Sequence, residues 1–194
     1  MSKIVLPEIQ IKKIESFIEK TYRKNVINND KWPEAPEDGW VEPENWYSRI
    51  HDIIRTMFVV KYIDGVKYLT EEISLLCEKH CLIDYEAREE GYYAVHINIP
   101  KIIDISGIGI KLRNEEITFE IQVTTQLQEL IRKLLHKYYE ENRVKNQPEG
   151  RIWQWDYLSD EFSVNYIGHI LHYIEGMIVE VRDSKGGSNG TKVS

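Results

Sequence analysis

The sequence predicts a mixed α/β fold, in which a β-sheet of about five strands is flanked by helices. Stretches rich in β-branched or alternating residues, at 53–62, 92–100 and 118–124, are typical of strands. Between and around them, apolar residues recur at the three- and four-residue spacing of amphipathic helices. With 194 residues and 42% hydrophobic content, the chain is long enough for one core, so we expect a single domain over residues 1–182.

The first third of the chain predicts a helix followed by a loop. Residues 7–28 place Ile11, Ile14, Phe17 and Ile18 on one helical face, and the lysines between 12 and 24 are expected to form a solvated face. Residues 30–45 combine prolines and acidic residues with two tryptophans, which disfavours regular structure but allows aromatic packing. We expect an ordered loop there that acts as a flap.

The remaining elements follow in order. Residues 53–62 predict a buried strand, 64–80 a helix, and 92–100 and 118–124 two further strands. In the last strand Glu120 and Gln122 share one face, opposite the apolar residues. A helix is expected at 126–143, with Thr124 or Thr125 as its N-cap, another at 163–181, and a flexible tail over 183–194.

Composition excludes several classes of protein. No run of eighteen uncharged apolar residues occurs and the N-terminus lacks a signal-peptide pattern, so we expect a cytoplasmic protein that contacts no membrane. The formal charge of −7 argues against a general nucleic-acid coat protein. Cys77 and Cys81, one helical turn apart in an apolar stretch, are expected to be reduced core thiols and not part of a secreted disulfide framework.

Two carboxylates and two arginines suggest a site for a metal and phosphates. Asp52 begins one β-rich run and Glu120 lies within another, and Mg²⁺ is typically held by one or two carboxylates with water completing its shell. The alternative is that Asp52 is a strand-end charge and Glu120 a solvated alternating position. Arg55 and Arg88 are the best placed residues to bind phosphate oxygens.

An aromatic residue follows a glycine at the start of the 92–100 strand. Gly91 permits a tight turn, and the ring of Tyr92 would then be placed to stack on a nucleobase. The alternative is an ordinary strand tyrosine. Both His96 and His136 are consistent either with phosphate binding or with a buried, hydrogen-bonded imidazole.

The order of these motifs resembles a known family. Asp52-Ile-Ile-Arg55, Gly91-Tyr92-Tyr-Ala-Val-His96, Glu120-Ile-Gln122-Val-Thr-Thr and His136-Lys137 resemble the RelA/SpoT alarmone synthetase domain over residues 45–145. The resemblance implies a nucleotidyltransferase-like fold. It also implies magnesium binding by Asp52 and Glu120, stacking of Tyr92 on the acceptor base, and a phosphate contact from Arg88.

The sequence departs from that family at basic positions. Thr124 stands where the family has an arginine after the Glu-Ile-Gln motif, Met57 stands where it has another, and Cys81 lies near the position of a lysine. Arg55, on the same strand face as Met57, would substitute. The segment between His96 and Glu120 is also longer than in the housekeeping enzymes.

The resemblance implies transfer of pyrophosphate from ATP to the 3′-hydroxyl of GDP, GTP or an adenine nucleotide, with either Glu120 or Gln122 orienting the hydroxyl. Two alternatives stay open. One is a toxin that modifies the 3′ end of tRNA and is neutralised by an antitoxin protein. The other is a degenerate, nucleotide-binding module. An oligomer is compatible with each.

Overall fold

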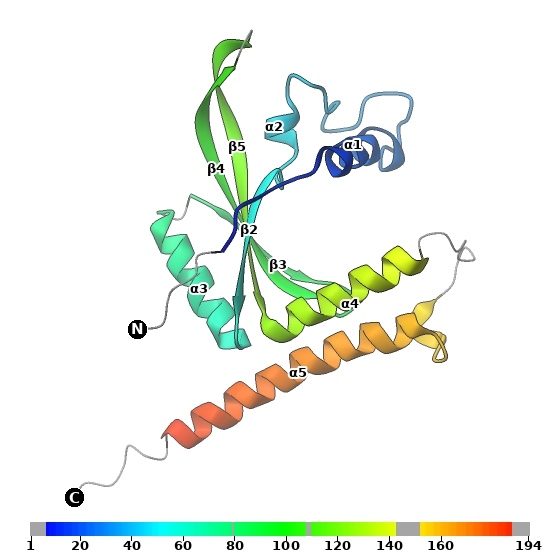
Figure 1. Cartoon of the computed structure of the whole chain (residues 1–194), viewed down its shortest axis with the longest axis vertical. Helices are drawn as coiled ribbons and strands as arrows, with labels where there is room; N and C mark the ends of the chain where they lie inside the picture. The colour runs from blue at the N-terminus through cyan, green and yellow to red at the C-terminus, as the bar shows by residue number, and fades with distance from the viewer. Residues whose placement is uncertain (1–6, 79, 108–109, 143–151, 188–194) are drawn as a thin grey trace, which may run out of the picture. The chain divides into compact units, whose positions relative to one another are not determined.

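The β-rich segments form one five-stranded mixed sheet with the order β1-β2-β5-β4-β3 in the computed structural model, which describes residues 7–78, 80–107, 110–142 and 152–187 (Figure 1). The strands are β1 (Gln10–Ile11), β2 (Ile54–Val60), β3 (Leu82–Ala87), β4 (Tyr93–Gly107) and β5 (Ile110–Thr125). The helices are α1 (Ile14–Tyr22), α2 (Trp46–Arg49), α3 (Ile63–Leu76), α4 (Gln126–Asn142) and α5 (Asp160–Gly187). The predicted mixed sheet with flanking helices is confirmed.

The chain folds as two compact units. The first unit comprises Met1–Met57, Cys77–Ile83 and Ile97–Gln122, and the second comprises Phe58–Leu76, Asp84–His96 and Val123–Ser194. The residues singled out from the sequence divide between them. Asp52, Arg55, Glu120 and Gln122 belong to the first unit, whereas Arg88, Tyr92, His96 and His136 belong to the second.

The N-terminal helix of the first unit begins later than the sequence indicated. Gln10 and Ile11 pair with Arg55 and Ile54 as an antiparallel edge strand, and the Lys12 N–H donates to the Ile53 carbonyl at 2.8 Å. These bonds to β2 replace the helical bonds that a helix over 7–28 would make there. The helix starts at Ile14 and continues into a π-helical turn at Arg23–Ile27.

The tryptophan-containing loop of the first unit is ordered by specific contacts. The Asn25 side chain bonds both the N–H and the carbonyl of Val41 at 2.9 Å, and Val41 is buried. The rings of Trp32 and Trp40 meet edge to face with centroids 6.0 Å apart. The expectation of an ordered loop therefore agrees with these contacts, and its action as a flap stays a prediction.

Strands β4 and β5 are much longer than the alternating segments that predicted them. They form the long ribbon that stands out in Figure 1, whereas the expected strands covered only 92–100 and 118–124. Strands β1 and β3 were not anticipated individually. Segment 82–87 was missed because its residues are mostly exposed and its pattern is weak.

The helices of the second unit pack around the start of β4. Tyr92 and Ala94 form a buried cluster with Ile131 and Leu135 of α4, and Val164 and Leu171 of α5 pack against it. Thr125 caps α4, since its Oγ1 accepts the Gln128 N–H at 3.2 Å. Helices α4 and α5 therefore run side by side (Figure 1).

The C-terminal helix α5 is longer than the sequence predicted. This helix spans Asp160–Gly187 and not 163–181, so residues 183–187, expected to be part of a flexible tail, are helical. Residues 188–194 lie outside the described part. Neither Cys77 nor Cys81 forms a disulfide, and Cys77 lies just beyond the end of α3. Of the helices that the structure describes, none has the length and apolar character needed to span a bilayer.

Candidate functional site

Asp52 forms ion pairs with two lysines of the first unit. It lies just before β2, where its Oδ2 is 2.7 Å from Lys12 Nζ and its Oδ1 is 2.7 Å from Lys20 Nζ. The pairing of β1 with β2 positions Lys12, and the last turn of α1 positions Lys20. The carboxylate is only 18% exposed, so the three charges form a compact, partly desolvated group.

The lysines set the ionisation of Asp52. Burial alone would raise the pKa of this carboxyl, but hydrogen bonds and charge from Lys12 and Lys20 outweigh it and lower the pKa to about 2. Asp52 is therefore an anion throughout the physiological pH range. Two ammonium groups on one carboxylate leave an excess of positive charge, which suits a phosphate.

These lysines correct an expectation from the sequence, which assigned the basic residues of 12–24 to a solvated face. Lys12 is only 13% exposed and Lys20 is 36% exposed. Lys12 lies before the helix begins and so does not belong to its outer face. No sequence pattern distinguishes Lys12, because its position beside Asp52 depends on the pairing of Gln10 and Ile11 with β2.

Glu120 lies on the strand next to the one that Asp52 precedes. β5 neighbours β2 in the sheet, and a magnesium site shared by the two carboxylates requires such neighbouring strands. Glu120 is 8% exposed, and its Oε2 accepts the Gln122 Nε2–H at 3.1 Å. Gln122 therefore orients the Glu120 carboxylate, which agrees with the expectation that the two side chains share one strand face.

The carboxylates fit a magnesium ion better than they fit a metal held only by protein. Among the described residues no group of three or more His, Cys, Asp or Glu side chains could hold a metal. Mg²⁺ keeps several waters and needs only one or two carboxylates when phosphates supply the other oxygens. An ionised Asp52 and a buried Glu120 supply oxygen donors of that type.

A second group of predicted residues meets in the second unit. Glu86 of β3 joins two of them, because its Oε1 lies 2.5 Å from an Arg88 guanidinium nitrogen and its Oε2 lies 2.6 Å from His96 Nε2. The Arg88 guanidinium also lies 5.5 Å from the centroid of the Tyr92 ring. Arg88, Tyr92 and His96, inferred separately from the sequence, thus form one cluster with Glu86.

Tyr92 is more deeply buried than a base platform would require. It is 6% exposed and belongs to the apolar cluster of the second unit. Burial, followed by the charge of Glu86, raises the pKa of its hydroxyl to about 12, so the phenol stays protonated. A base would have to stack on the ring beside the Arg88 guanidinium, which is 56% exposed and can move.

Gly91 has two structural reasons to be glycine. Its φ of +78° belongs to the left-handed region, and it closes the turn in which its N–H donates to the Arg88 carbonyl at 2.9 Å. It also touches α5, because a β-carbon here would lie 2.4 Å from the Asn165 carbonyl oxygen. The glycine turn predicted before Tyr92 is present, and it packs against α5 at the start of β4.

Arg55, Thr124 and His136 differ in what the structure shows of them. Arg55 faces Gln10 across the β1–β2 pair, on the strand that Asp52 precedes. Thr124, at the position of a family arginine, is 1% exposed and donates its hydroxyl to the Tyr93 carbonyl at 3.0 Å, so it fastens β5 to β4. His136 lies within α4, but its side chain is outside the described residues.

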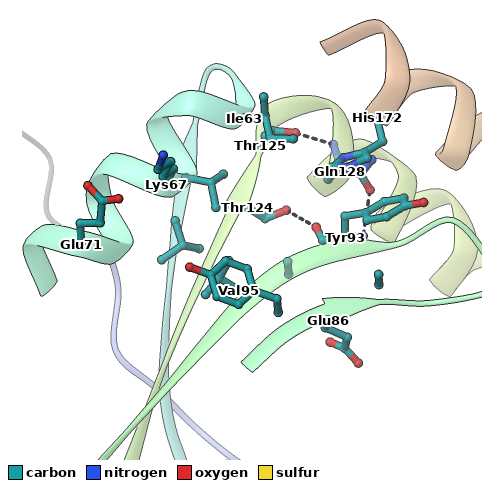
Figure 2. Close-up of a pocket in the computed structure, with 15 residues that line it drawn as sticks. Ile63, Lys67, Glu71, Glu86, Tyr93, Val95, Thr124, Thr125, Gln128 and His172 are labelled. Atoms are coloured by element: carbon teal, nitrogen blue, oxygen red, sulfur yellow. Dashed lines mark hydrogen bonds between the residues drawn. The ribbon is translucent and has the colours of Figure 1, made fainter. Parts of the chain in front are cut away.

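The second unit also contains a cavity of about 460 Å³, between α3, three strands and α5 (Figure 2). Its lining is mostly apolar, and Lys67 and Glu71 of α3 lie at its side. The Tyr93 ring stacks on His172 at 3.7 Å, and the Tyr93 hydroxyl lies 2.8 Å from His169 Nδ1. None of the residues predicted for the site lines this cavity.

No protein-family model matches the sequence, and no curated protein matches it either. Solved structures match the fold. Small alarmone synthetase 1 from Bacillus subtilis is 14% identical, with a TM-score of 0.63, over 95% of this chain and 82% of that one. Its complex with its product pppGpp is 13% identical, with a TM-score of 0.63, over 93% and 79% of the two chains.

A third structure is a GTP pyrophosphokinase family protein from Streptococcus pneumoniae. It is 16% identical, with a TM-score of 0.63, and the match covers 100% of this chain and 82% of that one. At these identities the likeness is one of fold. The chain therefore has the fold of the small alarmone synthetases, as the order of its motifs implied.

Proposed function

We propose that the protein is a magnesium-dependent pyrophosphotransferase that moves pyrophosphate from ATP to the 3′-hydroxyl of a guanine or adenine nucleotide. The observation that carries the proposal is the group formed by Asp52, Lys12 and Lys20 before β2, with Glu120 on the neighbouring strand β5. Phosphoryl transfer depends mainly on positioned cations and carboxylates, which this arrangement supplies. The fold is that of a small alarmone synthetase and of a GTP pyrophosphokinase family protein, which supports the proposal.

The lysines would bind the phosphates of ATP. An ammonium group has three donors, and the contact with Asp52 engages one of them. Lys20, which is 36% exposed, can therefore keep its bond to Asp52 while it contacts a phosphate oxygen. This assigns to Lys12 and Lys20 the positive charge that the sequence lacks at Met57 and Thr124.

Asp52 and Glu120 would hold the magnesium ion, which when bound neutralises charge on the phosphate oxygens. The low pKa of Asp52 keeps this ligand ionised without any metal. Gln122 cannot accept a proton, because its amide is not basic, so its role is to orient Glu120 through the 3.1 Å hydrogen bond.

The proposed reaction is a displacement at the β-phosphorus of ATP. The 3′-oxygen of the acceptor forms a bond to that phosphorus, the bond to the α–β bridging oxygen breaks, and AMP leaves. The proton of the 3′-hydroxyl passes to a carboxylate or to solvent. Arg88 and His96, joined by Glu86, are the candidates for contacts with the acceptor phosphates.

Thin-layer chromatography of purified protein with γ-labelled ATP and magnesium tests the proposal. GDP, GTP, AMP, ADP and total tRNA are offered in parallel. We expect label on a free nucleotide, and loss of at least about 10²- to 10³-fold in rate in Glu120→Gln and in Asp52→Asn, because each removes a negative ligand but keeps the side-chain shape.

The other outcomes separate the alternatives. Label on tRNA alone would favour the toxin, and co-expression with a neighbouring antitoxin gene would then restore growth. ATP binding with no transfer to any acceptor would indicate a degenerate module. Full activity in either variant would remove the metal assignment, even if pyrophosphate transfer itself were observed.

A further inference from the structure

The cavity of the second unit, about 460 Å³ in volume, has the size of a small-molecule site (Figure 2). Its described lining residues come from α3, from the strands β3, β4 and β5, and from α4 and α5, and all of them belong to the second unit. Pockets of about 300–1,000 Å³ with mostly apolar walls and a few polar groups are typical of sites for small ligands. The cavity therefore deserves a chemical assignment of its own.

The walls of the cavity are held in place by packing and hydrogen bonds. Val95 of β4 and Val123 of β5, which both line it, are 3% and 0% exposed. The Tyr93 ring, also in the lining, stacks on His172 with centroids 3.7 Å and planes 3° apart, and its hydroxyl lies 2.8 Å from His169 Nδ1. A ligand would therefore enter a formed site, which keeps the entropic cost of binding low.

The polar side chains deep in the lining are bonded to the protein itself. The Thr125 hydroxyl donates to Glu175 Oε2 at 2.9 Å and accepts the Gln128 N–H at 3.2 Å. The Gln128 side chain accepts the Tyr93 N–H at 3.2 Å and donates to the Gly168 carbonyl at 3.3 Å. Because these groups are already engaged, the cavity offers a ligand mainly apolar contacts.

The charges around the cavity disfavour a nucleotide or any other anion. Among the described lining residues Lys67 is the one lysine or arginine, whereas Glu71 and Glu86 bring two carboxyl groups. Burial, followed by the charge of His169, lowers the pKa of His172, so its imidazole is neutral at pH 7. Burying a charge without a partner is costly, so the lining suits an uncharged molecule.

We propose that this cavity is a binding site for a small, uncharged molecule that contains an aromatic ring. Tyr85, Tyr93 and His172 bring three rings to the lining, and aromatic rings attract one another in stacked and edge-to-face contacts. The apolar walls contributed by the valines of β4 and β5 would cover the rest of the ligand.

The proposed site is separate from the group proposed to hold magnesium. Neither Asp52 nor Glu120 lines the cavity, so ligand binding there does not rest on the proposed function. Glu86 does line it, and the carboxylate of this residue pairs with Arg88 and His96. A bound molecule would thus lie beside the residue that joins Arg88 to His96.

Isothermal titration of the full chain with 2-naphthol, without nucleotide or magnesium, tests the proposal. We expect one molecule bound per chain, with a Kd on the order of 0.1 mM for a ligand of this size. The charged probe 2-naphthoate has the same rings and should bind at least about tenfold more weakly. A wild-type protein that does not bind 2-naphthol saturably, or that binds the two probes equally, overturns the proposal.

Two valine-to-phenylalanine variants test where the probe binds. Val66→Phe fills the cavity from α3 and should weaken 2-naphthol binding at least about tenfold, because the added ring takes the space of the ligand. The matched control is Val59→Phe, at a 43% exposed position of β2 outside the lining, which should leave the Kd within about twofold of wild type. Unchanged binding in Val66→Phe would mean that the probe binds elsewhere.

Hydrogen exchange on the wild-type protein gives the location without any variant, so the test does not depend on whether Val66→Phe folds. Saturating 2-naphthol should slow exchange in residues 63–71 of α3 and 93–95 of β4, which contribute to the lining. Slowed exchange confined to the segment around Asp52, or to residues outside the lining, would refute the assignment.

Discussion

Lys20 Nζ lies 2.7 Å from Oδ1 of Asp52, and this ion pair connects the last turn of α1 to the segment that precedes β2. Lys12 Nζ lies at the same distance from the other carboxylate oxygen, Oδ2. The two contacts serve stability and function at once. They hold the N-terminal segment of the first unit in place, and they keep an ionised carboxylate at the proposed magnesium site.

The first prediction concerns acid stability. A depressed pKa in the folded state means that Asp52 contributes its stabilisation fully above the unfolded value near 3.8 and loses it as the pH falls toward about 2. After discounting for solvent screening, we expect about 1–2 kcal/mol. Urea unfolding of wild type and Asp52→Asn at several pH values should show a difference that is constant above about pH 5 and shrinks between pH 4 and 2. A difference independent of pH would refute the assignment.

A second prediction distinguishes direct phosphate binding by Lys12 and Lys20 from a non-specific effect of removing a positive charge. Lys12→Met and Lys20→Met should each raise the KM for ATP about 10- to 100-fold, the cost of one charge-assisted hydrogen bond. Lys13→Met is the matched control, because Lys13 is exposed and its side chain makes no cap hydrogen bond to α1. Its KM should stay within about twofold of wild type. Equal effects at all three positions would point to a non-specific loss of charge.

Lys12 and Lys20 also show which parts of the site could be predicted from the sequence and which could not. The residue pattern predicted the mixed sheet and selected Asp52 and Glu120, because strand alternation and the motif residues are local features. That their strands β2 and β5 are neighbours is a finding of the structure. Lys12 and Lys20 could not be found the same way. Their role depends on a two-residue edge strand that pairs with β2, a long-range contact that leaves almost no periodic signal.

Tyr92 and Gly91 illustrate the opposite case, in which a motif was found but its environment was not. The glycine turn was predicted, whereas its contact with Asn165 depends on how α5 crosses the start of β4. That helix could not be positioned from sequence, because many of its apolar residues are exposed whereas the polar Asn165 and Glu175 are fully buried. The burial of Tyr92 against α4 follows from the same packing.

A third prediction decides what the Tyr92 ring does. Tyr92→Leu fills the apolar cluster without a ring face, and Tyr92→Phe keeps the ring without the hydroxyl. If a base stacks on Tyr92, the leucine variant should raise the KM of the acceptor about 5- to 100-fold, while the phenylalanine variant stays within about threefold. Both should lose less than about 1.5 kcal/mol of stability. Equal acceptor KM values in the two variants would mean that Tyr92 is only a core residue.

The last prediction compares two glycines of α5. A β-carbon on Gly168 would lie 2.4 Å from the Gly91 carbonyl oxygen, whereas one on Gly176 would meet nothing within 4 Å. Gly168→Ala must therefore push α5 away from the turn before Tyr92, and we expect a loss of about 1–3 kcal/mol. Gly176→Ala should instead stabilise the helix by about 0.5–1 kcal/mol, since alanine has the higher helix propensity. Thermal unfolding of both variants measures the difference.

Because Arg88 and Tyr92 flank that turn, Gly168→Ala should also raise the KM of the acceptor while Gly176→Ala leaves it unchanged. Similar behaviour of the two variants would show that the close contact between α5 and the turn has no role in stability or in acceptor binding.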